Sequence, residues 1–225
     1  MTSRRLRVDS FEALLEPFSA SVNAKWLPRT LEADFDGLAH ALASRADDEG
    51  GLLVLDDALL TSLRGIDARA VEVLLEDRAR LAALGRDPQL NVITHYPRDT
   101  RGLPVSVDVH SFHVDRAPVE ADTFLCTYAG ASSEGLDDED AVRLIDDPLI
   151  ISALRELHGG DEGFADFLME GSFDLHFAKR PGAVPFTFGV GPLWRLAVAW
   201  PGAPVTPCIH RAPDADGRPR LMLIS

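Results

Sequence analysis

The hydrophobic pattern of the chain changes near residue 90. Before that point apolar residues recur every three or four positions, which is the period of an amphipathic helix. The pattern predicts helices over residues 10–16, 31–45 and 67–84, with a short buried strand over residues 51–56. Ser10 stands where a helix N-cap is expected, Pro17 where the first helix must stop, and Gly85 where the third should end. Residues 1–90 are therefore expected to form a helical layer.

After residue 90 the chain becomes a series of short β-rich runs separated by Pro, Gly and Asp. These runs cover residues 91–96, 105–114, 123–128, 173–178, 184–190, 194–200, 205–209 and 220–225. Eight strands of this length favour a jelly roll or barrel. The expected fold is mainly β with α: a core over residues 91–225, a helical layer packed on it, and an insertion at residues 131–172 that interrupts the strands.

The insertion carries much of the chain's acidity. Between Ala131 and Glu170 there are twelve acidic side chains and two arginines, and three helices are expected over residues 137–145, 147–157 and 161–168. The formal charge of the whole chain is −14, which argues against a nucleic-acid partner because phosphate contacts need clustered Lys and Arg. We interpret the insertion as a solvated lid. If it recognises anything, the substrate should be cationic.

The sequence pattern predicts no membrane segment. The basic start is followed by Asp9 and Glu12 rather than by an apolar run, so we expect no signal peptide. No run of apolar residues is long enough to span a bilayer. Cys126 and Cys208 lie far apart and show no framework spacing, so they are expected to be buried free thiols of a cytoplasmic protein, although a disulfide is not ruled out. The oligomeric state is left open.

Residues 105–115, VSVDVHSFHVD, suggest a metal site. Side chains on a strand alternate between its two faces, so His113 and Asp115 should share the interior face with the valines while His110 faces away. A mononuclear oxygenase iron needs two His and one carboxylate on one coordination face, which leaves three positions open. A buried His that is simply hydrogen-bonded to a carboxylate is the alternative interpretation. The pair still lacks a third ligand.

His210, ten residues before Arg220, supplies a candidate for that ligand. The order His-x-Asp, late His and final-strand Arg resembles the iron- and 2-oxoglutarate-dependent dioxygenase superfamily. This resemblance implies a double-stranded β-helix, Fe(II) ligated by His113, Asp115 and His210, and 2-oxoglutarate and dioxygen as co-substrates. It also implies that an Arg pairs with the distal carboxylate of 2-oxoglutarate, a contact that suits the two parallel donors of a guanidinium.

Arg220 is favoured for that role over Arg218 because it lies further into the apolar final run; an ordinary ion-pairing role at the end of a sheet is the alternative for Arg220. Tyr128 is a further candidate, as a hydrogen-bond donor to the co-substrate, although a buried core Tyr is common. His95, His158 and His176 have no partner motif, and His110 faces away from the metal by alternation, so all four are left out of the predicted site.

Four sequence blocks carry a closer resemblance. FHVDR at residues 112–116, LCTY at 125–128, HRAP at 210–213 and RLML at 220–223 are together similar to a bacterial family catalogued as domain of unknown function 1826. The similarity covers about residues 92–225. One departure is AGASSE at residues 129–134, where a Gly-rich turn containing Trp is expected. The metal residues survive this change, but the identity of the substrate cannot be inherited.

These patterns predict an oxygenase that hydroxylates or desaturates a small molecule, an amino acid or a peptide. Because Asp115 keeps a carboxylate at the metal, hydroxylation or desaturation is expected over halogenation. Two alternatives remain. One is a cupin-like metalloenzyme that does not use 2-oxoglutarate, and the other is a non-catalytic metal- or ligand-binding module on the same scaffold, since a fold does not determine a function.

Overall fold

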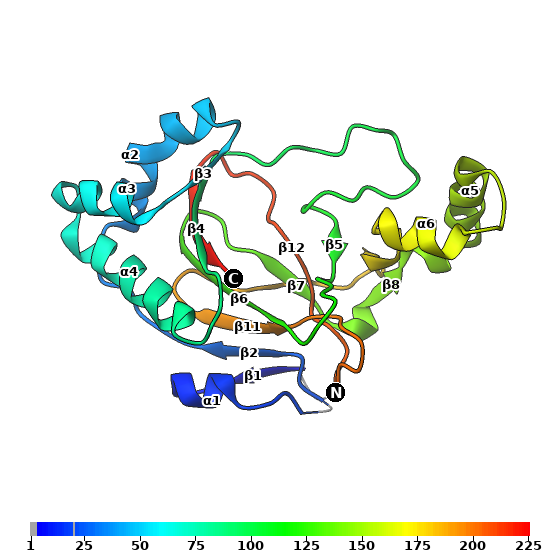
Figure 1. Cartoon of the computed structure of the whole chain (residues 1–225), viewed down its shortest axis with the longest axis horizontal. Coiled ribbons are helices and arrows are strands. Elements are labelled where there is room, and N and C mark those ends of the chain that lie inside the picture. Colours follow the sequence, from blue (N-terminus) through cyan, green and yellow to red (C-terminus); the bar gives the residue numbers. More distant parts are fainter. Residues whose placement is uncertain (1–3, 20) are drawn as a thin grey trace.

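The computed structural model describes residues 4–19 and 21–225, and it contains two β-sheets with helices at both ends (Figure 1). The larger sheet has the order β1 (Arg5–Arg7), β2 (Ala24–Leu27), β11 (Leu193–Ala197), β6 (Asp122–Ala129), β13 (Arg220–Ile224), β4 (Gln89–Ile93) and β3 (Leu52–Val54). The smaller sheet has the order β10 (Phe186–Thr187), β7 (Glu134–Leu136), β12 (Ile209–Arg211), β5 (Phe112–His113), β9 (His176–Lys179) and β8 (Ala141–Arg143). Apart from the parallel pair β1 and β2, neighbouring strands are antiparallel, and the large sheet is curled.

The helices fall into two groups (Figure 1). Those N-terminal to β4 are α1 (Phe11–Leu15), α2 (Phe35–Asp48), α3 (Asp57–Ser62) and α4 (Ala68–Ala82), and α2 to α4 lie on one side of the large sheet. The others, α5 (Pro148–His158) and α6 (Phe164–Glu170), lie at the opposite end of the molecule beside the small sheet. Short 3-10 turns occupy Leu63–Gly65, Asp138–Asp140, Leu144–Asp146 and Phe173–Leu175. No helix among the described residues has the length and apolar character needed to cross a membrane.

Side-chain caps fix where the N-terminal helices begin. The Ser10 hydroxyl accepts the Ala13 N–H at 3.1 Å, which confirms the predicted start of α1. Asp67 caps α4 in the same way, through the Ala70 N–H at 3.0 Å. Helix α2 begins four residues later than residue 31, because the Asp34 carboxylate takes the Gly37 N–H at 2.8 Å and starts the helix there.

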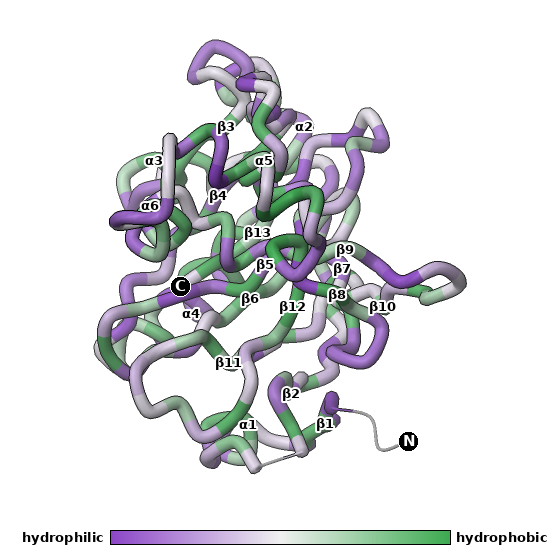
Figure 2. Tube along the Cα trace, turned by 90° about the vertical axis from the view of Figure 1, so that its right-hand side faces the viewer, coloured by the Kyte–Doolittle hydropathy of each residue, from purple (hydrophilic) through white to green (hydrophobic). Residues whose placement is uncertain are grey.

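The main hydrophobic core lies between these helices and the large sheet. Strand alternation sends Phe124 and Tyr128 of β6 and Leu221 and Leu223 of β13 toward α2 and α4, where they are almost fully buried. Each such aliphatic side chain contributes about 2 kcal/mol relative to exposure. The opposite face of the same strands looks between the two sheets. Figure 2 shows the apolar character of β6 and β13 against the more polar loops.

The structure corrects several predicted elements. Residues 105–111 are not a strand, because the Asp108 carboxylate accepts the N–H groups of Asp99 and His110 and so draws this backbone into a loop. Strand β3 is only half buried: Leu53 belongs to the core, but the strand lies at the sheet edge, with Leu52 and Val54 39% and 48% exposed. Residues 137–145 form 3-10 turns and β8 rather than a helix.

The predicted division of the chain also changes. The first 90 residues contribute β1, β2, β3 and part of β4 to the large sheet, so they are more than a helical layer. Strand β7, inside the predicted insertion at 131–172, is an internal strand of the small sheet. Both cysteines are free and buried, as expected from their spacing.

Candidate metal centre

His113, Asp115 and His210 come together at the middle of the small sheet. His113 ends β5 and His210 lies on β12, where the two residues are register partners in an antiparallel pair. Asp115 follows two residues after His113. One potential ligand atom from each of the three residues lies within 4.8 Å of the other two. The sequence-predicted ligand set is therefore brought together by one strand pairing and one two-residue step.

Both imidazoles are oriented by backbone carbonyls. Nδ1 of His113 lies 2.7 Å from the Ser111 carbonyl oxygen, and Nδ1 of His210 lies 3.2 Å from that of Cys208. Since a carbonyl only accepts, each Nδ1 carries the proton and donates it, which leaves the Nε2 lone pair free to bind a metal. Metal-binding histidines in proteins are usually held by such an outer hydrogen bond.

The carboxylate of Asp115 is also fixed. Its Oδ2 accepts a hydrogen bond from the Thr123 hydroxyl of β6, and the same oxygen lies 3.8 Å from Nε2 of His210. Burial alone would raise the pKa of Asp115, but the neighbouring His210 and the Thr123 hydrogen bond outweigh it and lower this pKa. Burial and His210 also lower the pKa of His113. At neutral pH these two residues are therefore a carboxylate and a neutral imidazole, the forms that bind a metal.

His176 lies beside this cluster and was missed by sequence reasoning. It is the register partner of His113 on β9, with ring centroids 5.7 Å apart, so His210, His113 and His176 form a row across three strands. Its Nδ1 is hydrogen-bonded to the Ser111 hydroxyl, and burial together with nearby His113 lowers its pKa to about 4. The sequence signal that could have placed His176 beside His113 was weak, because the pairing of β9 with β5 joins segments far apart in the sequence.

An open cleft of about 290 Å³ adjoins the cluster. His113, Asp115 and His176 line it, together with Ser172 and the loop around Asp108. A metal held by the three predicted ligands would therefore have open space next to it.

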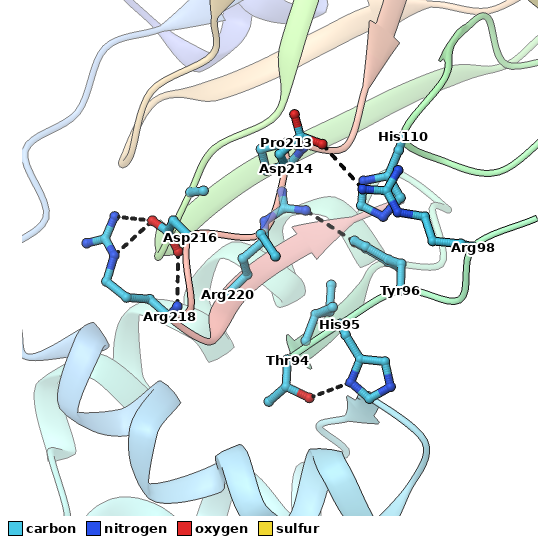
Figure 3. A pocket seen from close by; sticks show the side chains of 13 residues that line it. Thr94, His95, Tyr96, Arg98, His110, Pro213, Asp214, Asp216, Arg218 and Arg220 are labelled. Carbon is cyan, nitrogen blue, oxygen red and sulfur yellow. Dashed lines mark hydrogen bonds and ion pairs between the residues drawn. The ribbon is translucent and has the colours of Figure 1, made fainter.

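Arg220 lies in a different cavity, of about 140 Å³, shown in Figure 3. Its side chain is buried, and its Nη1 and Nη2 donate to the Tyr96 hydroxyl at 3.4 Å and the Ser133 hydroxyl at 3.2 Å. Its Nε is buried without a hydrogen-bond partner among the described residues. Burial lowers the pKa of Arg220, but an arginine of this kind stays charged at neutral pH.

Strand register connects the Arg220 guanidinium to the chain segment that pairs with His210. Gly135 of β7 is the register partner of His210, and Ser133, which binds the guanidinium, is two residues further along the same chain segment. Two strand residues span about 7 Å. Thr127, on the face of β6 that looks between the sheets, adds a buried hydroxyl without a hydrogen-bond partner in the described chain.

The other two predicted co-substrate residues lie elsewhere. Arg218 is exposed and paired with Asp216 at 2.7 Å, at the rim of the Arg220 cavity (Figure 3). It was placed on the last strand, but β13 begins at Arg220. Tyr128 points to the opposite face of β6, where its hydroxyl donates to Asp77 at 2.7 Å. Strand alternation therefore excludes Tyr128 from the space between the sheets.

These residues fit a divalent metal and a dicarboxylate. Two Nε2 atoms and one carboxylate form a donor set suited to Fe(II). The unpaired Nε of Arg220 and the unpaired hydroxyl of Thr127 are buried polar groups that a bound anion could satisfy, and such groups are uncommon in folded proteins. Comparison with known proteins found no matching family model, curated protein or solved structure. The resemblances drawn from the sequence therefore stay predictions.

Proposed function

We propose that this protein is an Fe(II)- and 2-oxoglutarate-dependent oxygenase with a double-stranded β-helix core. The observation that carries the proposal is the convergence of His113, Asp115 and His210 at one point beside an open cleft. Two imidazoles and one carboxylate, with no fourth protein ligand among the described residues, match the facial triad of oxygenase iron. The substrate would be a small molecule, an amino acid or a peptide.

The path of the chain supports the core assignment. Strands β4, β5, β6 and β7 alternate between the large and the small sheet, and so do β10, β11, β12 and β13. This alternation is what a jelly roll of eight strands requires. In this interpretation β1, β2 and β3 extend the large sheet, while β8, β9, α5 and α6 form the insertion between the two sets of four strands.

Arg220 supports the use of 2-oxoglutarate. The Arg220 guanidinium binds Ser133, two residues along the chain from the register partner of His210, and such a position suits a five-carbon diacid whose other end reaches the metal. The carboxylate would accept hydrogen bonds from the guanidinium, including the unpaired Nε, and from the Thr127 hydroxyl. When bound, the iron and 2-oxoglutarate supply the oxidising chemistry, with succinate and carbon dioxide as co-products.

The chain's own residues have distinct tasks in this scheme. His113, His210 and Asp115 hold the metal on one side and leave the cleft side open. Thr123 and the carbonyls of Ser111 and Cys208 keep these ligands in place. Burial of Arg220 excludes water from the carboxylate contact, which strengthens it. Because Asp115 keeps its carboxylate, the proposed oxidation is hydroxylation or desaturation rather than halogenation.

Anaerobic equilibrium dialysis with Fe(II) tests the metal site. The wild-type chain should bind one Fe(II), and Asp115→Ala should weaken binding by more than about 100-fold, since even residues that merely support ligands often contribute 10- to 100-fold. Asp161→Ala, which removes an exposed acidic residue that does not line the cleft, is the matched control and should bind as wild type. If Asp115→Ala binds Fe(II) as tightly as wild type, the assignment of this cluster as the metal site is wrong.

A cupin-like metalloenzyme that does not use 2-oxoglutarate is the second candidate. It is favoured by one observation: Arg220 lines a cavity that shares no lining residue with the cleft of His113 and Asp115. Oxygen consumption and succinate release by the Fe(II)-loaded protein separate the two. Succinate that forms only when 2-oxoglutarate is present supports the leading proposal, whereas oxygen uptake that is independent of 2-oxoglutarate supports the second. Iron binding without oxygen uptake points to the non-catalytic module.

A further inference from the structure

The cleft beside the candidate metal centre has polar groups of two kinds, those already paired and those left free. Arg116 is paired, because its guanidinium binds Asp174 at 2.7 Å and the Met169 carbonyl at 2.9 Å. Asp108 is also occupied, since its carboxylate holds the N–H groups of Asp99 and His110 at 3.0 Å. Arg116 therefore offers no unpaired charge to a ligand in the cleft, and the Asp108 carboxylate already serves as the acceptor that holds its own loop.

Ser172 is one of the free groups. Among the described residues it is the single non-glycine residue with a positive φ, 58°, a conformation that is unfavourable for a side chain other than Gly, Asn or Asp. It stands at the N-cap of the 3-10 turn Phe173–Leu175, yet its hydroxyl does not cap that turn. No hydrogen bond within the described chain engages this hydroxyl, and the residue lines the cleft.

His176 is the other free group. It is 4% exposed and lines the same cleft next to His113. Its Nδ1 is held by the Ser111 hydroxyl, so the ring cannot turn freely, and no described residue bonds to its Nε2. The ring therefore presents its Nε2 to the cleft at a fixed position.

We propose that Ser172 and His176 form the substrate-recognition wall of the cleft and bind an uncharged hydrogen-bonding group, such as an amide or a hydroxyl, beside the metal. This inference rests on the proposed function and names the substrate class that it acts on. The strained position of Ser172 is consistent with a binding role, because such backbone strain tends to occur at ligand sites.

Charge decides between substrate classes. A carboxylate or phosphate would need a free cation, and Arg116, the one cationic side chain that lines the cleft, is already neutralised by Asp174. An ammonium group would need a carboxylate within the wall, but Ser172 and His176 supply none, and Asp115 belongs to the metal set. The remaining lining residues, including Val107, Val109 and Leu175, are apolar and suit an aliphatic segment on either side of the polar group.

NMR of the full-length chain with isotopically labelled histidines, without added metal, tests this wall. The probes are N-methylacetamide, acetate and methylammonium, each at up to about 100 mM because single-group fragments bind weakly. N-methylacetamide should shift the ring signals of His176 in a saturable way and leave those of half-buried His158, which does not line the cleft, unchanged. A larger shift from acetate or methylammonium, or no shift of His176 with N-methylacetamide, overturns the proposal.

Ser172→Gly separates the hydroxyl from the strain. Glycine adopts the positive φ freely, so this variant should fold at least as well as wild type. Loss of the hydroxyl should weaken N-methylacetamide binding several-fold, and Ser172→Ala should do the same. Unchanged binding in both variants shows that the hydroxyl is not part of the wall. Because no metal is present, failure here is distinct from failure of the iron proposal, which only the Fe(II) measurements can show.

Discussion

Buried polar groups on the two faces of the large sheet differ in whether they have hydrogen-bond partners. On the helical side, the Asp77 carboxylate receives both Arg29 at 2.6 Å and the Tyr128 hydroxyl at 2.7 Å, and Arg29 also donates to the Gly191 carbonyl. On the side facing the small sheet, Thr127 and Arg220 keep unpaired polar atoms. Adjacent residues of one strand, Thr127 and Tyr128, thus show the difference directly. The named polar groups on the helical face are hydrogen-bonded within the protein. On the inner face, Thr127 and Arg220 keep unpaired atoms to which a ligand could hydrogen-bond.

Removing Asp77 should have the largest effect on stability. Asp77→Ala leaves the buried Arg29 without its counter-charge, and breaking such a pair costs about 3–5 kcal/mol. Urea denaturation should show this loss, while the fraction that remains folded should bind Fe(II) as wild type. Tyr128→Phe removes a single hydrogen bond of the same network and should cost only about 1–2 kcal/mol. A change below about 1 kcal/mol for Asp77→Ala would remove the distinction between the faces.

Arg220→Met should show the reverse pattern. It removes a buried charge that is only partly satisfied, so the free energy of unfolding should change by less than about 1 kcal/mol. Affinity for 2-oxoglutarate should fall by about 30- to 1000-fold, since charged hydrogen bonds worth about 2–4 kcal/mol are lost. Calorimetric titration of the Fe(II)-loaded protein with 2-oxoglutarate measures this affinity. Arg218→Met is the control and should bind 2-oxoglutarate normally. Equal losses in the two variants would contradict the assignment.

Two threonines on β6 allow a smaller, matched test. Thr127→Val deletes a buried hydroxyl without a partner and should stabilise the metal-free protein by about 1 kcal/mol. Thr123→Val deletes the hydroxyl that holds Asp115, so it should lower Fe(II) affinity by about 10- to 100-fold. Thermal denaturation and iron dialysis measure the two effects. If Thr127→Val lowers the melting temperature instead of raising it, the Thr127 hydroxyl has a hydrogen-bond partner that stabilises the fold.

The two thiols should show almost no reaction. Burial raises the pKa of Cys126 to about 12 and the pKa of Cys208 well above its ordinary value. The thiolate is the reactive form, so a disulfide-exchange reagent at pH 8 should label neither residue until the protein unfolds. Labelling followed by mass spectrometry measures this, and rapid labelling of Cys126 in the folded chain would show that the helical face opens readily.

Local signals in the sequence predicted local structure well. The starts of α1 and α4 follow from Ser10 and Asp67, because a cap acts over three residues. Strands β1 and β2 went unpredicted because three or four residues cannot show a period. The alternation applied to residues 105–111 was wrong because Asp108 side-chain bonds, invisible in the hydrophobic pattern, formed a loop instead.

The residues of the candidate site also differ in whether local sequence patterns could predict them. His113 and Asp115 could be paired from their two-residue spacing, and His210 from its position in the chain order. The neighbourhood of His176 depends on the pairing of β9 with β5, which no local pattern encodes. Tyr128 was misplaced because its sequence block gives no indication of which face of β6 it occupies, whereas contact with Asp77 of α4 decides it.

The most direct test of the central claim is an anaerobic titration of the wild-type chain with Fe(II) and then 2-oxoglutarate, followed by visible absorption. Chelation of 2-oxoglutarate by iron held between His113, Asp115 and His210 should produce a metal-to-ligand charge-transfer band that saturates at one equivalent. The band should be absent in Asp115→Ala and should need far more 2-oxoglutarate in Arg220→Met. A wild-type protein that shows no band at saturating Fe(II) and 2-oxoglutarate would contradict the account.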